Sequence, residues 1–322
     1  MEHSEKSRKV SVIMLAYNHA PYVSEAIESV LSQNRDFSME VLIGDDASTD
    51  GTARIVGEYA NRYPDLIVPV LREQNIGATE NLYDLIQRAE GAYLAYLECD
   101  DYWSDPQKLC RQVEFLENHP AYIGCTHRVT LVDPNGRPLE EKLSWVRDKS
   151  VYTLEDFDGI TLAGHGNSLV HRNFFPVSKG KYRTLLTLHS LIGDRPLCLL
   201  LVSMGPIYQM QEEFGCYRRP VADGGSATSV LFINNPEKNL DDYRFTKKLE
   251  TYARDKLQIY ANFEPYKNEL LLGAVWTFLR HPDRYSATAA WEMLHDRHRP
   301  EHIRFLVTQI IKKIISKLRC RP

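Results

Sequence analysis

The alternation of short apolar runs with amphipathic segments over residues 10–98 most constrains how this 322-residue chain can fold. Four apolar, β-branched-rich runs predict buried strands: Val10–Ala16, Val41–Ile43, Leu66–Arg72 and Tyr93–Glu98. Three segments between them have apolar residues at helical spacing: 22–33, 52–63 and 78–90. Strands that alternate with helices of this length form a parallel sheet with crossover helices. We therefore predict an α/β fold with a Rossmann-like, mostly parallel sheet flanked by helices.

Polar or charged residues follow each of the four predicted strands. In chain order they are Tyr17 and Asn18, Asp45 and Asp46, Arg72 and Asn75, and Glu98, Asp100 and Asp101. The carboxyl ends of parallel strands share one edge of the sheet, and α/β sheets bind ligands in the crevice beyond that edge. The sequence therefore predicts one site built from four strand ends.

The sequence YLAYLECDDYW places three carboxylates, Glu98, Asp100 and Asp101, at the end of a core strand. Such a cluster can be an acid and base pair, a metal site or a solvated loop. We favour the metal site, because so much negative charge beside an apolar strand repels itself without a cation. Oxygen ligands without a His or Cys pattern select a hard ion, Mg²⁺ or Mn²⁺, and such an ion suits a nucleotide diphosphate.

The remainder of the chain has a mixed pattern. We predict strands within 123–133 and 164–172, an apolar helix over 193–205, and an exposed, Gly-rich loop with two adjacent arginines over 214–227. From Pro236 onward the pattern is helical and highly charged. The predicted domains are a catalytic domain, 1–235, and a helical C-terminal region, 236–322. The first has a nucleotide-binding half, about 10–120, and an acceptor half, about 121–235.

Composition excludes several classes of protein. A net charge of -4 and a pI of about 6.3 argue against a nucleic-acid partner, which requires clustered Lys and Arg. Six cysteines without a CxxC pair indicate neither a zinc site nor a disulfide framework. The N-terminus lacks the pattern of a signal peptide, and no segment reaches the roughly 18 apolar residues of a membrane-spanning helix. We predict a cytoplasmic protein, and no sequence feature indicates an oligomeric state.

The C-terminal segment 302–321 combines apolar residues at three- and four-residue spacing with six Lys and Arg residues. This pattern predicts a basic amphipathic helix. It could lie as a peripheral anchor on the anionic inner face of the cell membrane, close to a lipid-linked acceptor, or pack against the catalytic domain. Because the rest of the chain is acidic, we favour the membrane contact.

Four segments in order, VSVIMLAYN, VLIGDDASTDGT, LREQNIGATEN and AEGAYLAYLECDDYWSDPQKL, resemble the family 2 glycosyltransferases, which have the GT-A fold. The resemblance is close over residues 10–120 and looser to about 228. Family members usually carry DxDD, whereas this chain has Glu98 in the first place. The resemblance implies an inverting enzyme that moves a sugar from a nucleotide diphosphate, preferably a UDP-sugar, to a hydroxyl of a glycan or glycolipid. Surface polysaccharide biosynthesis is the expected setting.

The resemblance also implies roles by matching position. Asp101 would bind the metal ion, and Asp100 would face the ribose or the metal. An Asp of the Asp45–Asp46 pair would accept a hydrogen bond from the base. The remaining residues expected near the nucleotide are Ala16, Tyr17, Asn18 and Arg72.

Asp194 occupies the position where inverting family members place the base that takes the acceptor's proton. Its alternative role is an ordinary helix N-cap. A loop carrying Arg218, Arg219 and Ser226 resembles the cationic loop that closes over the diphosphate, or is a merely exposed basic turn.

Two aromatic side chains complete the predicted site. His165 would contact the donor sugar or the acceptor, or be a buried structural histidine. Trp103 would stack on a sugar face, or pack beneath the metal loop.

Three other functions compete with this one. A nicotinamide-dependent oxidoreductase requires GxGxxG after the first strand, but residues 16–20 contain no glycine. A nucleotidyltransferase would have a Gly-rich, basic first loop, which is absent. A non-catalytic, membrane-associated module that binds nucleotide sugar would have lost metal affinity through Glu98.

Overall fold

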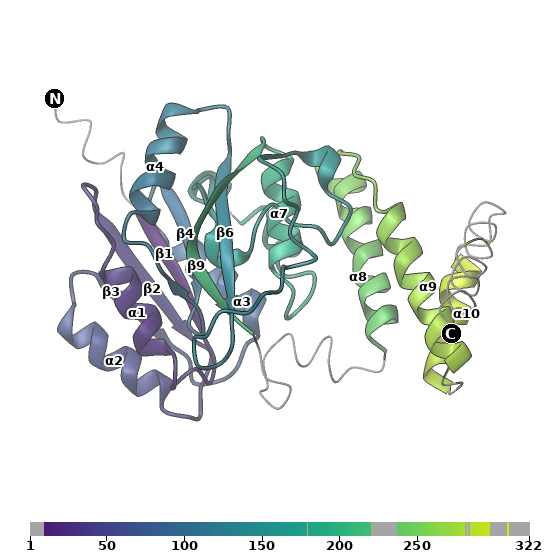
Figure 1. Ribbon diagram of the computed structural model, residues 1–322, viewed down its shortest axis with the longest axis horizontal. Coiled ribbons are helices and arrows are strands. Elements are labelled where there is room, and N and C mark those ends of the chain that lie inside the picture. The colour runs from purple at the N-terminus through teal and green to yellow at the C-terminus, as the bar shows by residue number, and fades with distance from the viewer. Residues whose placement is uncertain are drawn as a thin grey trace. The chain divides into compact units, whose positions relative to one another are not determined.

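A computed structural model describes residues 10–178, 180–219, 237–280, 282, 284–296 and 308 (Figure 1). The chain divides into two compact units, Met1–Val221 and Ala222–Pro322. The predicted domain boundary at 235/236 lies C-terminal to this division, in a segment outside the described residues.

The first half of unit 1 contains four parallel strands in the order β3-β2-β1-β4. The strands are β1 Val10–Ala16, β2 Met39–Asp45, β3 Ile67–Leu71 and β4 Tyr93–Glu98. The crossover helices are α1 Val23–Leu31, α2 Thr52–Arg62 and α3 Ala78–Arg88. This half confirms the predicted α/β fold.

The second half continues the same sheet with strands of both directions. After β4 the order is β8-β6-β9-β5, and β7 also pairs with β9. Its strands are β5 Tyr102–Trp103, β6 Gly124–Val132, β7 Val151–Tyr152, β8 Val170–Arg172 and β9 Ile207–Arg218. Its helices are α4 Lys108–Asn118, α5 Phe175–Ser178, α6 Arg183–Leu186 and α7 Asp194–Val202, with 3₁₀ turns η2 Leu154–Asp156 and η3 Gly166–Ser168. β8 is antiparallel to both β4 and β6, whereas β9 is parallel to β6.

Alternate residues of the parallel strands face two different layers of helices. Val41 and Ile43 of β2 belong to one core with the apolar faces of α1, α2 and α4. A Cβ on Gly44 would instead point at α3, because successive side chains of a strand face opposite sides of the sheet. The fully buried runs predicted for β1, β2 and β4 follow from this double coverage.

The strand register brings the predicted strand ends together. Ala16 pairs with Asp45 across β1 and β2, and Leu15 pairs with Glu98 across β1 and β4. Residues 16–18, 45–46 and 98–101 therefore emerge at the same edge of the sheet, as the sequence predicts.

Close packing between β2 and α3 makes Gly44 a sensitive position. A Cβ there would lie 2.4 Å from Asn81 Oδ1 and 2.8 Å from Leu85 Cδ1. We expect Gly44→Ala to lower the free energy of unfolding by about 1–3 kcal/mol, because overpacking forces the neighbours to move. Gly57→Ala in α2 is the control: a Cβ there meets nothing within 4 Å, and alanine stabilises a helix by about 0.5–1 kcal/mol. Equal urea midpoints for the two variants would contradict this packing.

Tyr96 and His171 form a buried polar pair between β4 and β8. The Tyr96 hydroxyl lies 2.7 Å from His171 Nε2, and His171 Nδ1 lies 2.7 Å from the Arg172 carbonyl oxygen. Because the carbonyl can only accept, Nδ1 carries the proton and Nε2 accepts from the tyrosine. Burial lowers the pKa of His171 to about 4, so the ring is neutral near pH 7, with its one proton on Nδ1.

This pair makes the protein sensitive to acid. As the pH falls below the ordinary histidine pKa of 6.5, His171 of the unfolded chain becomes protonated. In the folded protein the same histidine stays neutral down to about pH 4. We expect this histidine alone to cost about 2 kcal/mol of stability between pH 7 and pH 5. His171→Gln keeps an acceptor for Tyr96 without titrating, so its urea unfolding should lose that much less over the same interval. An unchanged pH dependence in the variant would refute the assignment.

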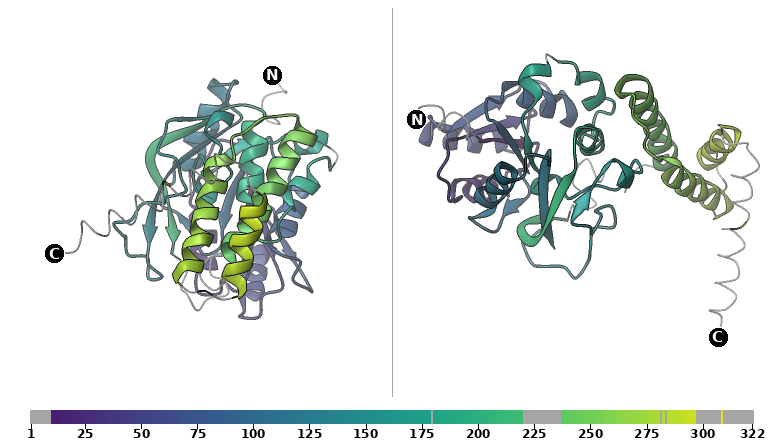
Figure 2. Two further views of the ribbon diagram at one scale, coloured as in Figure 1. Left: turned by 90° about the vertical axis from the view of Figure 1, so that its right-hand side faces the viewer. Right: turned by 90° about the horizontal axis from the view of Figure 1, so that it is seen from above.

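The described part of unit 2 is helical. α8 Lys238–Tyr252, a π-helical turn Ala253–Leu257, α9 Glu264–Arg280 and α10 Arg284–Asp296 follow one another, and the three α-helices pack together (Figure 2). Arg244 of α8 pairs with Glu292 of α10, and Lys267 of α9 pairs with Glu250 of α8. Among the described residues, we find no helix with the length and apolar character needed to span a membrane.

Candidate active site

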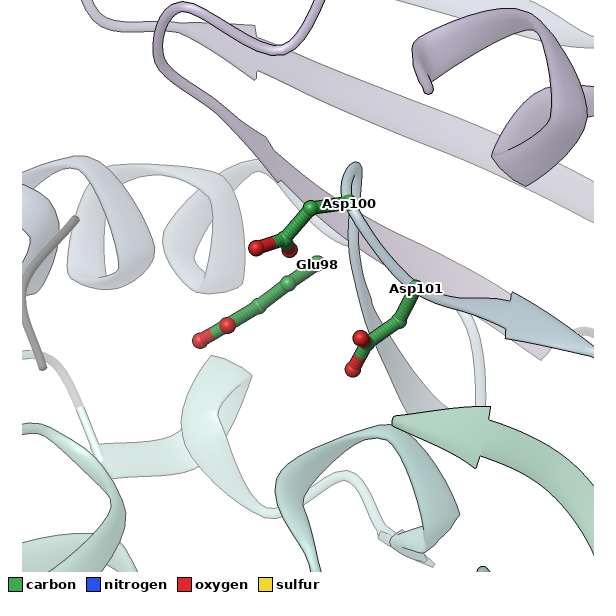
Figure 3. A group of neighbouring side chains, drawn as sticks. All are labelled: Glu98, Asp100 and Asp101. Atoms are coloured by element: carbon green, nitrogen blue, oxygen red, sulfur yellow. The ribbon is translucent and has the colours of Figure 1, made fainter. Parts of the chain in front are cut away.

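The three carboxylates that end β4 lie around one tight turn (Figure 3). Glu98, Asp100 and Asp101 each offer one oxygen, and these atoms lie within 4.8 Å of one another. The turn is closed by the Asp101 amide, which donates to the Glu98 carbonyl oxygen at 3.0 Å. The backbone thus positions three acidic side chains from four consecutive residues in one small volume.

Asp101 is buried and held by two hydrogen bonds. Its Oδ1 accepts from the Arg218 backbone amide at 2.8 Å, and its Oδ2 accepts from Asn167 Nδ2 at 2.9 Å. Asp100 is less constrained, because its buried Oδ1 has no hydrogen-bond partner among the described residues. His19 Nε2 lies 3.8 Å from the other Asp100 oxygen.

The electrostatics of this cluster fit a cation. Burial, and then the charges of Asp100 and Glu98, raise the pKa of Asp101 well above its usual range. Although Glu98 is partly exposed to solvent, desolvation and the charges of Asp100 and Asp194 raise its pKa to about 8. A divalent cation would favour the ionised forms of these carboxylates, and the unpartnered oxygen of Asp100 could bind it. The donor set is all oxygen, which fits Mg²⁺ or Mn²⁺.

Asp194 is the first residue of α7 and is exposed. The N-cap is Gly193, and Asp194 Oδ1 accepts from the adjacent Arg195 amide at 2.8 Å, so the N-cap alternative is wrong. Its charge raises the pKa of both Glu98 and His165, so it lies within electrostatic range of the acid cluster. An exposed carboxylate beside the cluster is suited to take a proton from a bound hydroxyl.

His165 lies between these acids. Its Nδ1 accepts from the Asn167 amide at 3.4 Å and lies 3.8 Å from Asp101 Oδ2, and its ring packs 4.1 Å from that of Tyr217. Burial lowers the pKa of His165, against the opposing effects of the Asn167 hydrogen bond, Asp194 and Asp100. A neutral imidazole that carries its proton on Nε2 is therefore available at the site.

The loop after β1 is tied to the loop after β2. The Asn18 amide donates to Ser48 Oγ at 2.8 Å, and the His19 amide donates to Thr52 Oγ1 at 2.9 Å. Asn18 has a φ of 56°, and its Oδ1 accepts from the Thr49 amide at 2.8 Å. These bonds hold the backbone beside Tyr17, a residue that is 40% exposed at this edge of the sheet.

Comparison with known proteins identifies this arrangement. Residues 11–176, about half of the chain, match the family model described as Glycosyl transferase family 2. The chain belongs to glycosyltransferase family 2. The resemblance found in the sequence is thereby confirmed.

Two relatives of this family 2 chain differ in how much of it they match. It is 42% identical to the Mycobacterium tuberculosis protein Rv1520, which is uncharacterized, over 54% of this chain and 46% of that protein. It is 38% identical to the Bacillus subtilis minor teichoic acid biosynthesis protein GgaB, over 79% of this chain but 27% of GgaB. The aligned region thus spans less than half of either relative.

The solved structure of S. aureus TarS in complex with UDP-GlcNAc matches with a TM-score of 0.62. The sequences are 18% identical, and the match covers 89% of this chain and 80% of that one. This likeness supports the predicted GT-A fold.

Four of the residues predicted to lie near the nucleotide have structural partners here. Asp46 accepts from the Ile76 and Gly77 amides at 2.8 and 2.9 Å, and Asp45 accepts from the Ser48 amide at 3.0 Å. Arg72 donates to Asn81 and Asp84 of α3. Ala16, the last residue of β1, is buried and its carbonyl accepts from the Asp46 amide. All four residues lie at the predicted edge, and their contact with a nucleotide stays a prediction.

Two predictions about this region need correction. Trp103 is 3% exposed; its indole NH donates to the Asn167 carbonyl oxygen at 2.8 Å and Lys108 Nζ lies 3.8 Å from its ring centroid. It therefore packs beneath the metal loop and has no free face for a sugar. The stretch 214–218, predicted as exposed loop, is the end of β9. Its pairing with β6 and β5 could not be seen in the local sequence.

Arg218 is the last residue of β9 and is buried. Its side chain is 5% exposed, and its guanidinium donates to the Asp100 carbonyl oxygen at 2.8 Å, to the Pro134 carbonyl oxygen at 3.0 Å and to Glu25 at 2.6 Å. Arg218 thus stabilises the acid turn through the Asp100 carbonyl oxygen, and it does not belong to a cationic loop that closes over the diphosphate. Arg219 is half-exposed and pairs with Glu141. Ser226 lies outside the described residues.

Sequence reasoning missed two neighbours of the acid cluster, His19 and Asn167. His19 directly follows the Tyr17–Asn18 pair, so its place in the first loop was a usable signal. Asn167 stands in the segment GHGNS (164–168), where an asparagine between Gly and Ser resembles an ordinary turn residue.

Proposed function

We propose that this protein is an inverting, metal-dependent glycosyltransferase that moves a sugar from a nucleotide diphosphate to a hydroxyl of a glycan or lipid-linked acceptor. One observation carries the proposal: three carboxylates converge where β4 ends, and the exposed carboxylate of Asp194 lies within electrostatic range of Glu98. A non-catalytic module would need the acid cluster only for binding and would have no use for Asp194.

Asp100 and Asp101, with Glu98 beside them, would hold Mn²⁺ or Mg²⁺ against the donor diphosphate. The ion would act as a Lewis acid that offsets the negative charge gained by the leaving nucleoside diphosphate. Tyr17, Asn18 and the strand-end residues of β2 and β3 would surround the nucleoside. A UDP-sugar is the favoured donor, because TarS, which has the same fold, was solved with UDP-GlcNAc.

Asp194 would act as the general base. It lies at the start of α7 and close enough to Glu98 to raise its pKa, while the metal ligands come from the end of β4. A base in this place can take the acceptor's proton while the diphosphate leaves from the opposite face of the sugar. The carboxylate can accept this proton because the hydroxyl becomes more acidic as the new bond forms.

The acceptor and the location of the enzyme are also proposals. GgaB takes part in minor teichoic acid biosynthesis, which supports a polysaccharide or lipid-linked acceptor used in surface polymer synthesis. Such an acceptor is reached from the cytoplasmic side by a peripheral enzyme. The membrane contact predicted for 302–321 concerns a segment in which only residue 308 is described.

A transfer assay tests the proposal. The purified protein is incubated with Mn²⁺, a panel of nucleotide-diphosphate sugars and a panel of glycan and lipid-linked acceptors, and nucleotide release is measured with and without acceptor. We expect acceptor-dependent release from one donor, with an inverted anomeric configuration of the product by NMR. Retention of configuration would exclude the role of Asp194, and donor binding without any transfer would favour the non-catalytic module.

A further inference from the structure

Asn167 lies directly against the metal-binding end of the site. It is 1% exposed, and its Nδ2 donates both to Asp101 Oδ2 at 2.9 Å and to the Cys216 carbonyl oxygen at 3.0 Å. Because a carbonyl oxygen only accepts, the Cys216 bond fixes which end of the amide is the NH₂ group. The second hydrogen of that group is therefore aimed at Asp101.

The backbone of Asn167 is held in place from the core. The Trp103 indole NH donates to the Asn167 carbonyl oxygen at 2.8 Å, and Gln112 Nε2 donates to the Ser168 carbonyl oxygen at 2.8 Å. The Ser168 hydroxyl closes the turn by donating to the His165 carbonyl oxygen at 2.6 Å. The turn η3 is thus bonded to β5 and α4, so the Asn167 side chain starts from a fixed point.

Asp101 receives one hydrogen bond on each carboxylate oxygen, from two different elements. The Arg218 amide of β9 donates to Oδ1, and Asn167 of η3 donates to Oδ2. Two donors on different sides prevent the carboxylate from rotating. Each oxygen keeps a second lone pair, so both bonds are compatible with binding a cation. Of the two donors, only Asn167 acts through a side chain and can be removed by substitution.

We propose that Asn167 is a positioning residue that orients Asp101 for the divalent cation. The inference rests on the proposed function, in which Asp101 is a metal ligand. Groups that orient a metal ligand through hydrogen bonds typically contribute 10- to 100-fold to metal affinity. Asn167 would therefore act on the metal rather than on the donor or acceptor directly.

The test measures Mn²⁺ affinity of the full-length protein by electron paramagnetic resonance, without any donor. Asn167→Leu has a similar volume and removes the NH₂ group, and Asn167→Ala is the second variant in case leucine is not accommodated. Asn173→Leu is the matched control: the Asn173 amide donates to the Gly91 carbonyl oxygen at 2.8 Å, at the amino end of β4 and away from the acids. Thermal unfolding of every variant separates loss of structure from loss of metal binding.

We expect the Mn²⁺ Kd to rise about 10- to 100-fold in the Asn167 variants and to stay unchanged in Asn173→Leu. The inference would be overturned if Asp101→Ala abolished Mn²⁺ binding but the folded Asn167 variants bound Mn²⁺ with unchanged affinity. If the unchanged protein bound no Mn²⁺, the proposed metal site would fail first and the role of Asn167 with it.

Discussion

Replacing Asp194 by asparagine is expected to lower kcat about 10²- to 10⁴-fold, the contribution typical of a general base. The side chain keeps its size but no longer accepts the acceptor's proton. The donor Kd should stay the same, because Asp194 sits at the start of α7 and the donor is expected to bind at the ends of β1, β2 and β4. Steady-state kinetics with the donor and acceptor found in the transfer assay, together with donor calorimetry, separate the two quantities.

A purely structural role for Asp194 predicts a different result. An acidic residue in the first turn of a helix contributes about 0.3–1 kcal/mol through the helix dipole, so its loss would lower stability with little effect on kcat. Asp65→Asn is the control, because this exposed residue precedes β3 at the opposite edge of the sheet. A kcat for Asp194→Asn equal to that of Asp65→Asn would remove Asp194 from the mechanism.

Asp101→Ala has the second large effect that we expect. Its loss should weaken Mn²⁺-dependent binding of the nucleotide sugar by at least about 100-fold, more than the loss of an orienting neighbour costs. The physical reason is that the cation shields the diphosphate from Glu98 and Asp100, which would otherwise repel it. The measurement is the calorimetric Kd of the UDP-sugar with Mn²⁺ and again with EDTA, in the variant and in the unchanged protein.

The difference between the Kd measured with Mn²⁺ and the Kd measured with EDTA decides whether Asp101 holds the cation. In Asp101→Ala the Kd values with Mn²⁺ and with EDTA should be nearly equal, whereas in Asp65→Asn they should differ as much as in the unchanged protein. Persistence of a large Mn²⁺ effect in Asp101→Ala would place the cation on other residues. Since Asp101 is buried, circular dichroism must first show that the variant folds.

The parallel half of the fold could be predicted because its information is local. Each strand of residues 10–98 is a continuous apolar run, and each helix has one apolar face, so neither depends on distant partners for recognition. The same pattern located the site, because parallel strands bring Ala16, Asp45 and Glu98 to one edge. The acid cluster was therefore located from the strand pattern, whereas Asp194 was proposed only from its matching position in the family.

The mixed half could not be predicted at the same level. β5 and β7 have two residues each and β8 has three, so they exist only through pairing with distant strands. The end of β9 contains Gly215 and Arg218, and Arg219 follows it, a composition typical of a loop, yet Arg218 is buried by Glu25 and by the acid turn. Trp103 and Asn167 likewise owe their roles to contacts that no sequence spacing reveals.

The central claim is that the acids ending β4 hold a divalent ion against a nucleoside diphosphate. Calorimetric titration of UDP, GDP, ADP and CDP into the unchanged protein, with Mn²⁺ and again with EDTA, tests it most directly. The account predicts that one nucleotide, with UDP favoured, binds in Mn²⁺ and loses its affinity in EDTA. Binding of none of them, or equal affinity with and without the metal, would contradict it.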